Sequence, residues 1–305
     1  KNISEISVDM QQFGVGIEEA YASAAKLSDT FGDQFMASNK ANVEYVAAMA
    51  KNLGVAEESS AEVLRNFMGL GKMSSETARY MSAQVVSLSK AAGVPLNKVM
   101  NDIAKASGET LALVRGSVTQ LIKASVEARR LGTNLEAVSS AAGKLLDFQS
   151  SIAEEMEASV LMGKDLNLQR ARQLAYEGNL ADLAREQSDI ISKAGKMDYY
   201  QQQALAKALG LSVEQVTQIR AKQEELSELR RQDPNFARQY EEQMRKIDDL
   251  TKANKQDLKT KYEQELKSQQ VQAVQTQLAN QFKTLIAEIA DLLTPIFKGL
   301  SVVGP

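Results

Sequence analysis

The sequence lacks three residue types that carry much of protein chemistry, because it contains no histidine, no cysteine and no tryptophan. Without histidine there is no side chain that ordinarily exchanges protons near neutral pH, and no imidazole ligand for a metal. Without cysteine there is no thiolate nucleophile, no disulfide and no thiolate zinc site. We therefore expect no enzymatic activity, no metal and no cofactor in this chain.

Proline, aromatic residues and net charge are also scarce. Four prolines interrupt 305 residues, and aromatic residues make up 5% of the chain although hydrophobic residues make up 44%. No segment has the alternating β-branched pattern of a strand, and filling with Ala and Met suits closely packed helices. A formal charge of −3 gives no general attraction to nucleic acid or to an anionic membrane. The composition predicts an all-α fold.

A helix–glycine–helix turn recurs through residues 1–221. The glycines of this turn are Gly54, Gly93, Gly132 and Gly210, which are separated by 39, 39 and 78 residues. Such glycines typically end a helix in the left-handed conformation, and Ser212 with Gln215 has capping-box spacing for the next helix. The pattern predicts helical hairpins. A repeat of 39 residues is one interpretation, although the segments between the glycines align poorly.

Apolar residues at helical spacing predict the core faces of these hairpins. One stripe is formed by Val43, Val46, Ala47, Ala50 and Leu53, and a second by Leu111, Val114, Val118, Leu121, Ile122 and Val126. We interpret both stripes as core or as helix-pairing surface, because amphipathic helices bury such faces.

The segment Gly69–Ser74 resembles half of a phosphate-binding loop. The full motif requires glycine at position 66, where this chain has Asn66, and a hydroxyl where it has Met73. No predicted strand precedes the segment. It is interpreted as a glycine-rich break between helices.

The segment Leu205–Val216 resembles the helix-turn-helix of DNA-binding repressors. Its second helix would present Gln215, Gln218, Arg220 and Lys222 to DNA. The same turn occurs elsewhere in the chain, however, and no basic patch surrounds this copy. A packing hairpin is the favoured interpretation, and a nucleic-acid-binding protein is retained as the alternative.

Residues 222–281 are more polar and predict a long, coiled-coil-like helix with a single apolar seam. The seam is too narrow to be buried alone, so it requires a partner helix, most simply from an identical chain; we expect a trimer, or otherwise a hexamer. Its spacing is closer to 11 residues in three turns than to a heptad. Asp233–Pro234 marks the start of this helix, since proline is tolerated in a first helical turn. Together with its continuation, the seam comprises Phe236, Tyr240, Met244, Ile247, Leu258, Tyr262, Leu266, Val274, Leu278, Phe282, Leu285, Ile289, Leu292 and Ile296.

Residues 282–305 form an apolar, amphipathic C-terminal segment. Glu288, Asp291 and Lys298 interrupt it, whereas a membrane span requires about 20 nearly uncharged residues. We interpret it as oligomer core, with transient insertion into a membrane interface, as in a membrane-active effector, as the alternative. The chain begins at Lys1 without Met and ends directly after this stretch, so we expect it to be a fragment of a longer protein.

The block Asp147–Gln187 has the most distinctive pattern in the chain. It resembles the E-x-E-A-x-x-L-x-G-x-x-L-N-L-x-x-A-R-x-x-A-x-x-G block of tail tape measure proteins of contractile-tailed bacteriophages. The matching residues include Ile152, Glu155, Glu157, Ala158, Leu161, Gly163, Leu166, Asn167, Ala171, Arg172, Ala175, Gly178 and Leu183. The charged helix and the Leu292–Phe297 ending downstream are also similar to that family.

The resemblance implies an extended helical structural protein of the virion. Tape measure proteins lie within the tail tube, are anchored toward the baseplate hub, set the length of the tube and leave ahead of the DNA. Implied partners are other copies of the chain and the hub, spike and tube proteins, with DNA only as a neighbour and no small-molecule substrate. The chain would be made in the host cytoplasm and would form the compact, hub-proximal part of the ruler. A generic coiled-coil scaffold is a further alternative, in which the length of the helix would not set the length of any assembly.

Overall fold

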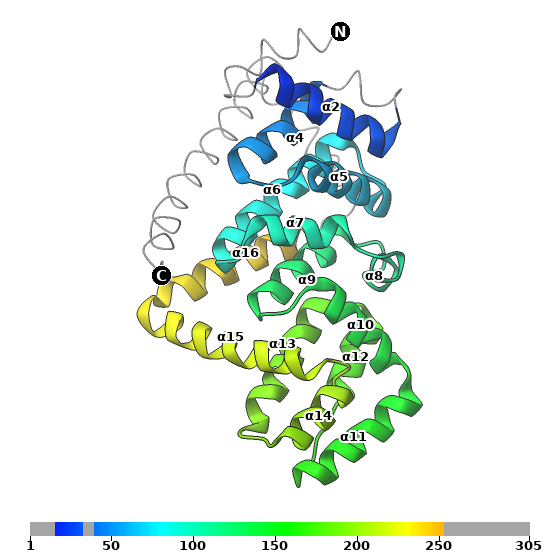
Figure 1. Cartoon of the computed structure of the whole chain (residues 1–305), viewed down its shortest axis with the longest axis vertical. Helices are drawn as coiled ribbons and strands as arrows, with labels where there is room; N and C mark the ends of the chain where they lie inside the picture. The colour runs from blue at the N-terminus through cyan, green and yellow to red at the C-terminus, as the bar shows by residue number, and fades with distance from the viewer. Residues whose placement is uncertain (1–15, 33–39, 253–305) are drawn as a thin grey trace. The chain divides into compact units, whose positions relative to one another are not determined.

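The computed structural model describes residues 16–32 and 40–252, which form fourteen helices and no strand (Figure 1). The predicted all-α class is confirmed for these residues. The helices are α2 (Ile17–Phe31), α4 (Lys40–Leu53), α5 (Glu57–Gly71), α6 (Ser75–Ala92), α7 (Leu96–Ala104), α8 (Gly108–Leu113), α9 (Val118–Arg130), α10 (Leu135–Leu146), α11 (Phe148–Met162), α12 (Gln169–Glu177), α13 (Leu180–Ala194), α14 (Tyr199–Ala208), α15 (Val213–Gln232) and α16 (Pro234–Lys252).

The chain divides into two compact units, of which the first comprises Lys1–Arg65 and Asp249–Pro305. In its described part α2 packs against α4. Lys51 of α4 pairs with Glu19 of α2, and this hydrogen bond lowers the pKa of the Glu19 carboxyl. Ser23 Oγ donates a hydrogen bond to Glu57 Oε1 at the start of α5, at 3.0 Å. Polar contacts therefore tie α2 to both of its neighbours.

The second unit, Asn66–Asp248, is built around α9. This helix packs against α6, α7, α10 and α13, and all but two of its thirteen residues are buried. A helix buried on all sides is normally apolar throughout. Nevertheless, Lys123, Glu127 and Arg130 are among the buried residues of α9. These three charges require partners inside the unit, because an unpaired buried charge is strongly unfavourable.

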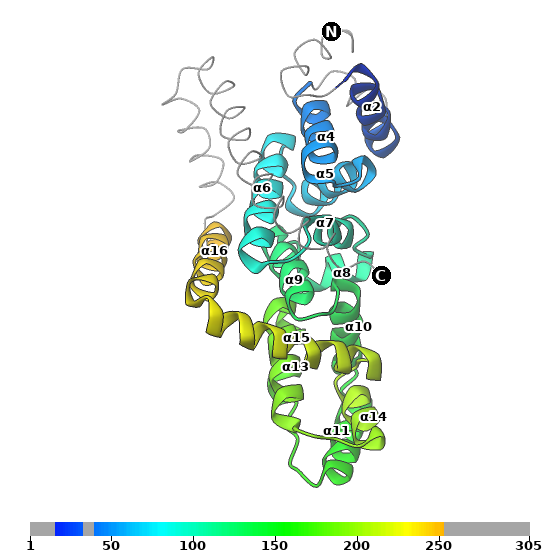
Figure 2. The same cartoon turned by 60° about the vertical axis from the view of Figure 1, so that its left-hand side comes forward.

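Most of the remaining helices of the second unit pack on one another. α10 packs against α12, α11 against α14, and α13 against both α12 and α15. Figure 2 shows α15 crossing α13, after which the chain turns and α16 lies beside α6 and α9. The last two helices therefore return from one end of the unit toward its middle.

The predicted glycine turns are confirmed. All four glycines have positive φ, 63° at Gly54, 65° at Gly93, 84° at Gly132 and 72° at Gly210. The same conformation ends α11 at Gly163 and α12 at Gly178. The turn therefore recurs at intervals that do not follow 39 residues, and it is a general helix ending rather than the mark of a strict repeat.

The second predicted stripe, residues 111–126, belongs to two helices and not to one. The chain breaks between α8 and α9 at Arg115 and Gly116, whose φ values are 51° and 75°. Ser117 then caps α9, since its Oγ accepts a hydrogen bond from the Gln120 backbone N–H at 3.2 Å. The apolar spacing continued across the break, so periodicity alone could not reveal it.

The predicted boundary at residue 222 falls inside α15, which runs without interruption from Val213 to Gln232. The break comes instead at Asp233, which is extended with φ −131° and ψ 91°. Pro234 accounts for this, because a proline disfavours the helical conformation of the residue before it and is tolerated at the first position of a new helix. The part of the predicted long helix after residue 252 lies outside the described residues.

Candidate functional site

The glycine-rich segment Gly69–Ser74 is a turn between two helices. It joins the end of α5 to the start of α6, and Ser74 Oγ accepts a hydrogen bond from the Thr77 backbone N–H at 3.3 Å. The first turn of α6 is thus capped by the chain itself. Among the described residues there is also no group of three or more acidic, His or Cys side chains that could hold a metal ion.

The helix-turn-helix-like segment uses much of its second helix inside the molecule. Ser212 and Gln215 form a capping box at the start of α15. A Cβ at Gly132 would lie 3.0 Å from both Gln218 O and Lys222 Cβ, so this face of α15 lies against the turn after α9. Lys222 Nζ also pairs with Glu225 at 2.6 Å. These contacts favour the packing hairpin over a free recognition helix.

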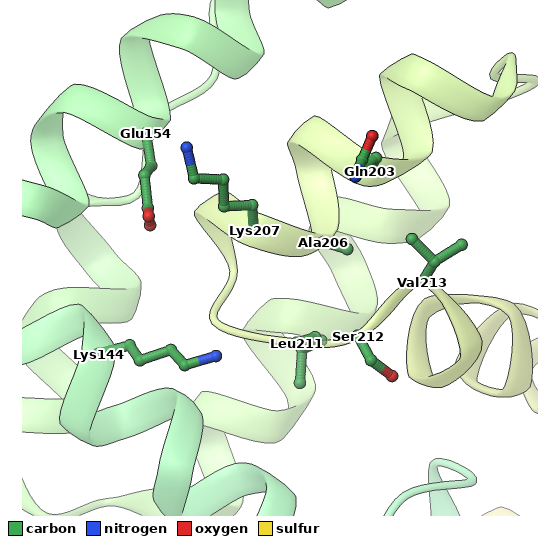
Figure 3. A pocket seen from close by; sticks show the side chains of 8 residues that line it. All are labelled: Lys144, Glu154, Gln203, Ala206, Lys207, Leu211, Ser212 and Val213. Carbon is green, nitrogen blue, oxygen red and sulfur yellow. The ribbon is translucent and has the colours of Figure 1, made fainter.

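A shallow depression of about 330 Å³ lies beside the same turn, lined by Lys144, Glu154, Gln203, Ala206, Lys207, Leu211, Ser212 and Val213. Figure 3 shows Lys144 and Lys207 extending into it from different helices. Each lysine already has an acceptor, because Lys207 Nζ lies 3.0 Å from Glu157 Oε2 and Lys144 Nζ lies 3.5 Å from Gly210 O. The hydrogen bond and the charge of Glu157 raise the pKa of Lys207. Both lysines of the depression are therefore already engaged by acceptors of the chain, and Glu154 is the remaining charged residue of its lining.

A buried ion cluster at the centre of the second unit contains the most perturbed titratable groups. Glu127 of α9 is fully buried and accepts hydrogen bonds from Arg130 at 2.8 Å and from Arg185 of α13 at 3.2 Å. The hydroxyl of Tyr240, on α16, donates a third. The Arg130 guanidinium stacks on the Tyr240 ring, with 4.4 Å from Cζ to the ring centroid. One carboxylate thus joins three helices that are distant in sequence.

The electrostatics of this cluster keep Glu127 ionised. Burial alone would raise the pKa of Glu127, but the positive charges of Arg130 and Arg185 and their hydrogen bonds outweigh burial and lower it. Burial, together with the negative charge of Glu127, raises the pKa of the Tyr240 hydroxyl. These shifts keep Glu127 ionised and Tyr240 protonated, so Tyr240 remains the hydrogen-bond donor. Such an arrangement links helices and is unlike a pair of residues that exchange a proton.

The cluster continues toward the end of α16 through a second ion pair. Lys123 Nζ of α9 lies 2.6 Å from Asp248 Oδ1, and the Lys123 side chain is 9% exposed. At the start of α16 the Phe236 ring lies against Gly93, where an added Cβ would come within 3.2 Å of it. Three points of contact, at Phe236, Tyr240 and Asp248, hold α16 against the body of the unit.

The matching residues of the Asp147–Gln187 block hold α11 against α12. Glu155 Oε1 accepts a hydrogen bond from the Leu168 backbone N–H at 2.9 Å, and Glu155 Oε2 lies 2.6 Å from Arg172 Nη2. Ala171 is fully buried beside them. Gly163 and Gly178 end the two helices. These residues therefore fix the connection between α11 and α12 and the ends of both helices, whereas α11 itself packs mainly against α14 and α12 against α10 and α13.

Other residues of the block lie on its surface. The Asn167 side chain accepts a hydrogen bond from the Gln169 backbone N–H at 3.0 Å, at the start of α12. Glu157 pairs with Lys207 in solvent. Leu161 is 47% exposed. Packing within the chain therefore does not explain why Leu161 is part of the pattern.

A row of large apolar side chains runs along the exposed face of α11. Phe148, Ile152, Met156 and Val160 follow at every fourth residue and are 51%, 46%, 65% and 81% exposed. Residues at this spacing share one side of a helix. A contiguous exposed apolar row is typical of a surface that binds another protein. One residue of this row, Ile152, is also among the matching residues of the Asp147–Gln187 block.

The predicted seam divides at the limit of the described residues. Tyr240, Met244 and Ile247 are buried, with 2%, 4% and 1% exposure, and Phe236 is half-buried. Their partner in the structure is the chain itself, through the contacts of α16. The rest of the predicted seam lies outside the described residues, namely Leu258, Tyr262, Leu266, Val274, Leu278, Phe282, Leu285, Ile289, Leu292 and Ile296.

Sequence reasoning did not find the ion cluster. Glu127 and Arg130 are three residues apart on α9 and Arg185 lies on another helix. The available signal was a Glu–Arg pair at helical spacing directly after the predicted core stripe. Such a pair marks a charge that must be paired if the helix is buried.

None of the described helices is long and apolar enough to cross a membrane. Comparisons of the chain with known protein families, with curated proteins and with solved structures find no match.

Proposed function

We propose that this chain is a non-enzymatic structural protein, the hub-proximal part of a tail tape measure. In this role it lies in the lumen of a tail tube near the baseplate, associates with other copies of itself, contributes to the length of the tube and leaves ahead of the DNA. The observation that carries the proposal is the Asp147–Gln187 block, whose matching residues Glu155 and Arg172 link α11 to α12 and whose helix α11 presents an exposed apolar row.

The charges of the second unit support a structural role. The Glu127 carboxylate accepts hydrogen bonds from Arg130 and Arg185. Asp102 accepts hydrogen bonds from Arg129, one of them at 2.7 Å. The Glu127–Arg185 and Asp102–Arg129 pairs each join two helices. Among the described residues these charges thus serve the packing of the unit, and we assign its interactions to the surfaces of its helices.

The exposed row on α11 is the surface that we assign to the hub or tube proteins. Its four side chains lie on a helix that carries three glutamates and no basic residue. Glu155 and Glu157 are already paired with Arg172 and Lys207. The row is therefore apolar and nearly neutral, as expected for the centre of a protein interface.

Polar substitution of this row tests the assignment. We expect Met156→Gln with Val160→Gln to leave the thermal midpoint of the chain unchanged, because both side chains are exposed. Its incorporation into tailed particles should fall by about tenfold, since residues at the centre of an interface dominate binding. The amount of the chain in purified particles, measured by mass spectrometry, checks this. Leu229→Gln, on the 37% exposed Leu229 of α15, is the matched control; equal incorporation of both variants would contradict the assignment.

A change of helix length tests the ruler itself. Removal of 11 residues between residues 253 and 281 takes out about three helical turns and preserves the seam spacing. If the segment is helical in the tube, tails should shorten by about 16 Å, at 1.5 Å per residue. Electron microscopy of tails measures this change, and an 11-residue insertion at the same point should lengthen them equally. If the tails of both variants have the original length, the chain is better explained as a scaffold that does not set tail length.

A further inference from the structure

The exposed row on α11 has no charged residue in it, and the charges of the helix are engaged elsewhere. Glu155 pairs with Arg172 of α12. Glu157 pairs with Lys207 of α14, and Glu154 lines the depression in Figure 3. All three glutamates of α11 are therefore turned toward the chain itself. The row can meet a second apolar surface without burying an unpaired charge, which would be strongly unfavourable.

The row leaves an apolar area that is large for a single helix. Phe148, Ile152, Met156 and Val160 are 51%, 46%, 65% and 81% exposed. A large apolar residue offers about 150 to 200 Å² when it is fully exposed, so the four leave roughly 400 Å² uncovered. Two such faces placed together account for about 800 Å², close to the lower limit of about 1,000 Å² for a specific interface. A pair formed through this row is therefore weak and reversible.

The order of the side chains makes the row complementary to itself. When two copies of α11 lie antiparallel about residue 154, each side chain faces the one that is equally far from the opposite end of the row. Phe148, the largest, then faces Val160 of the second copy, the smallest. In the middle Ile152 faces Met156. Large side chains opposite small ones fill the space between helices evenly. In a parallel pair, by contrast, Phe148 would face a second Phe148.

The helix that presents the row is held on its other side. α11 packs against α14 and α10. Asp147 Oδ1 accepts a hydrogen bond from the Ser150 backbone N–H at 3.4 Å at the start of the helix, and Gly163 ends it in the left-handed conformation. The Gln201 side chain of α14 donates a hydrogen bond to Leu161 O at 3.2 Å. The row is thus preorganised, and association requires no segment of the chain to move, which limits its entropic cost.

We propose that a second copy of the chain covers the row through an antiparallel, symmetric pair of α11 helices before the chain meets a hub or tube protein. A symmetric pair is the commonest arrangement of identical chains, and it requires a face that is complementary to itself. The inference rests on the exposed row and not on the place of that row in a tail. On assembly a hub or tube protein replaces the second copy, which a weak pair allows. Until then the pair keeps the apolar side chains out of water.

Cross-linking through a single cysteine tests the pair in the full chain. The sequence has no cysteine, and Ala153 is exposed beside the middle of the row. In an antiparallel pair the two copies of Ala153→Cys lie on the same side of the contact, across from each other. A short bismaleimide should therefore link them. Ala221→Cys, at an exposed alanine of α15, is the matched control. We expect at least about fivefold more covalent dimer from Ala153→Cys, because pairing raises the local concentration of the second thiol. Gel electrophoresis under denaturing conditions measures the dimer.

Polar substitution of the row identifies the surface responsible. Met156→Gln with Val160→Gln, added to Ala153→Cys, should lower the yield of covalent dimer by about tenfold, since it places polar groups at the contact. Leu229→Gln, added in the same way, should leave the yield unchanged. Equal yields from Ala153→Cys and Ala221→Cys would overturn the pair, and so would a yield that survives the polar substitution.

Incorporation into tails gives a separate measure of the proposed function. If the polar substitution lowers incorporation but the chain forms no cross-linked dimer, the pair alone is overturned. If the chain forms the dimer and the substitution leaves incorporation unchanged, the pair is supported, whereas the assignment of the row to hub or tube proteins fails.

Discussion

Replacement of Glu127 by Gln is expected to lower the free energy of unfolding by about 3 kcal/mol, because it leaves the buried Arg130 guanidinium without its counter-charge. The value is at the lower end of the range for a broken buried pair, since Arg185 is 33% exposed and keeps its ion pair with Asp182 at 3.2 Å. Urea unfolding at pH 7, followed by circular dichroism, measures the loss. Glu241→Gln, at an exposed glutamate beside Tyr240, should change stability by less than about 0.5 kcal/mol.

The same substitution should change the response to acid. The pKa of Glu127 in the folded chain lies below its ordinary value of 4.5, so the unfolded chain takes up a proton first as the pH falls. The contribution of Glu127 to stability is therefore complete above pH 4.5 and is lost as the pH falls through the lower, folded-state pKa. Unfolding midpoints in urea between pH 3 and pH 7 should fall less steeply for Glu127→Gln than for the original chain. Parallel curves would show that Glu127 does not carry this charge.

The second large effect is expected at Gly178, where a Cβ would meet the backbone. Gly178 has φ +73°, and an added Cβ would lie 2.0 Å from the carbonyl oxygen of Leu113. Gly178→Ala combines left-handed strain of about 1 kcal/mol with displacement of a backbone segment, so we expect a loss of at least about 3 kcal/mol in the free energy of unfolding.

Gly163 supplies the matched control for Gly178. It has φ +62° and no atom within 4 Å of an added Cβ, so Gly163→Ala should cost only the strain, about 1 kcal/mol. The two glycines end the consecutive helices α11 and α12, and the difference between the two variants isolates the approach of Gly178 to Leu113. Equal losses would mean that this close approach is absent.

The helices and their glycine endings could be predicted from the sequence, because both are local. Apolar spacing and a following glycine are properties of about ten neighbouring residues, and Gly54, Gly93, Gly132 and Gly210 all adopt the predicted conformation. The break at Arg115 was missed because the stripe on either side of it keeps the same spacing. A short interruption that preserves periodicity leaves no trace in the pattern.

The candidate site could be predicted less well, because its contacts are not local. The Tyr240 hydroxyl and Glu127 are 113 residues apart, and no spacing rule connects them. For α16 the apolar pattern correctly marked Tyr240, Met244 and Ile247 as residues to be covered. The spacing of apolar residues predicts that a helix face is covered. It does not indicate whether the covering surface belongs to the same chain or to another molecule.

The position of Arg130 on the same helix as Glu127 has a consequence for synthesis. During translation Glu127 emerges together with Arg130, three residues away, whereas Arg185 follows 58 residues after Glu127 and Tyr240 follows 113 residues after it. At about 10 residues per second, the carboxylate spends roughly six seconds with Arg130 alone and about eleven seconds before Tyr240 appears. A nascent α9 thus carries its own counter-ion before its other partners are made. When α16 emerges, Tyr240 completes the cluster around a carboxylate that has been paired with Arg130 from the start.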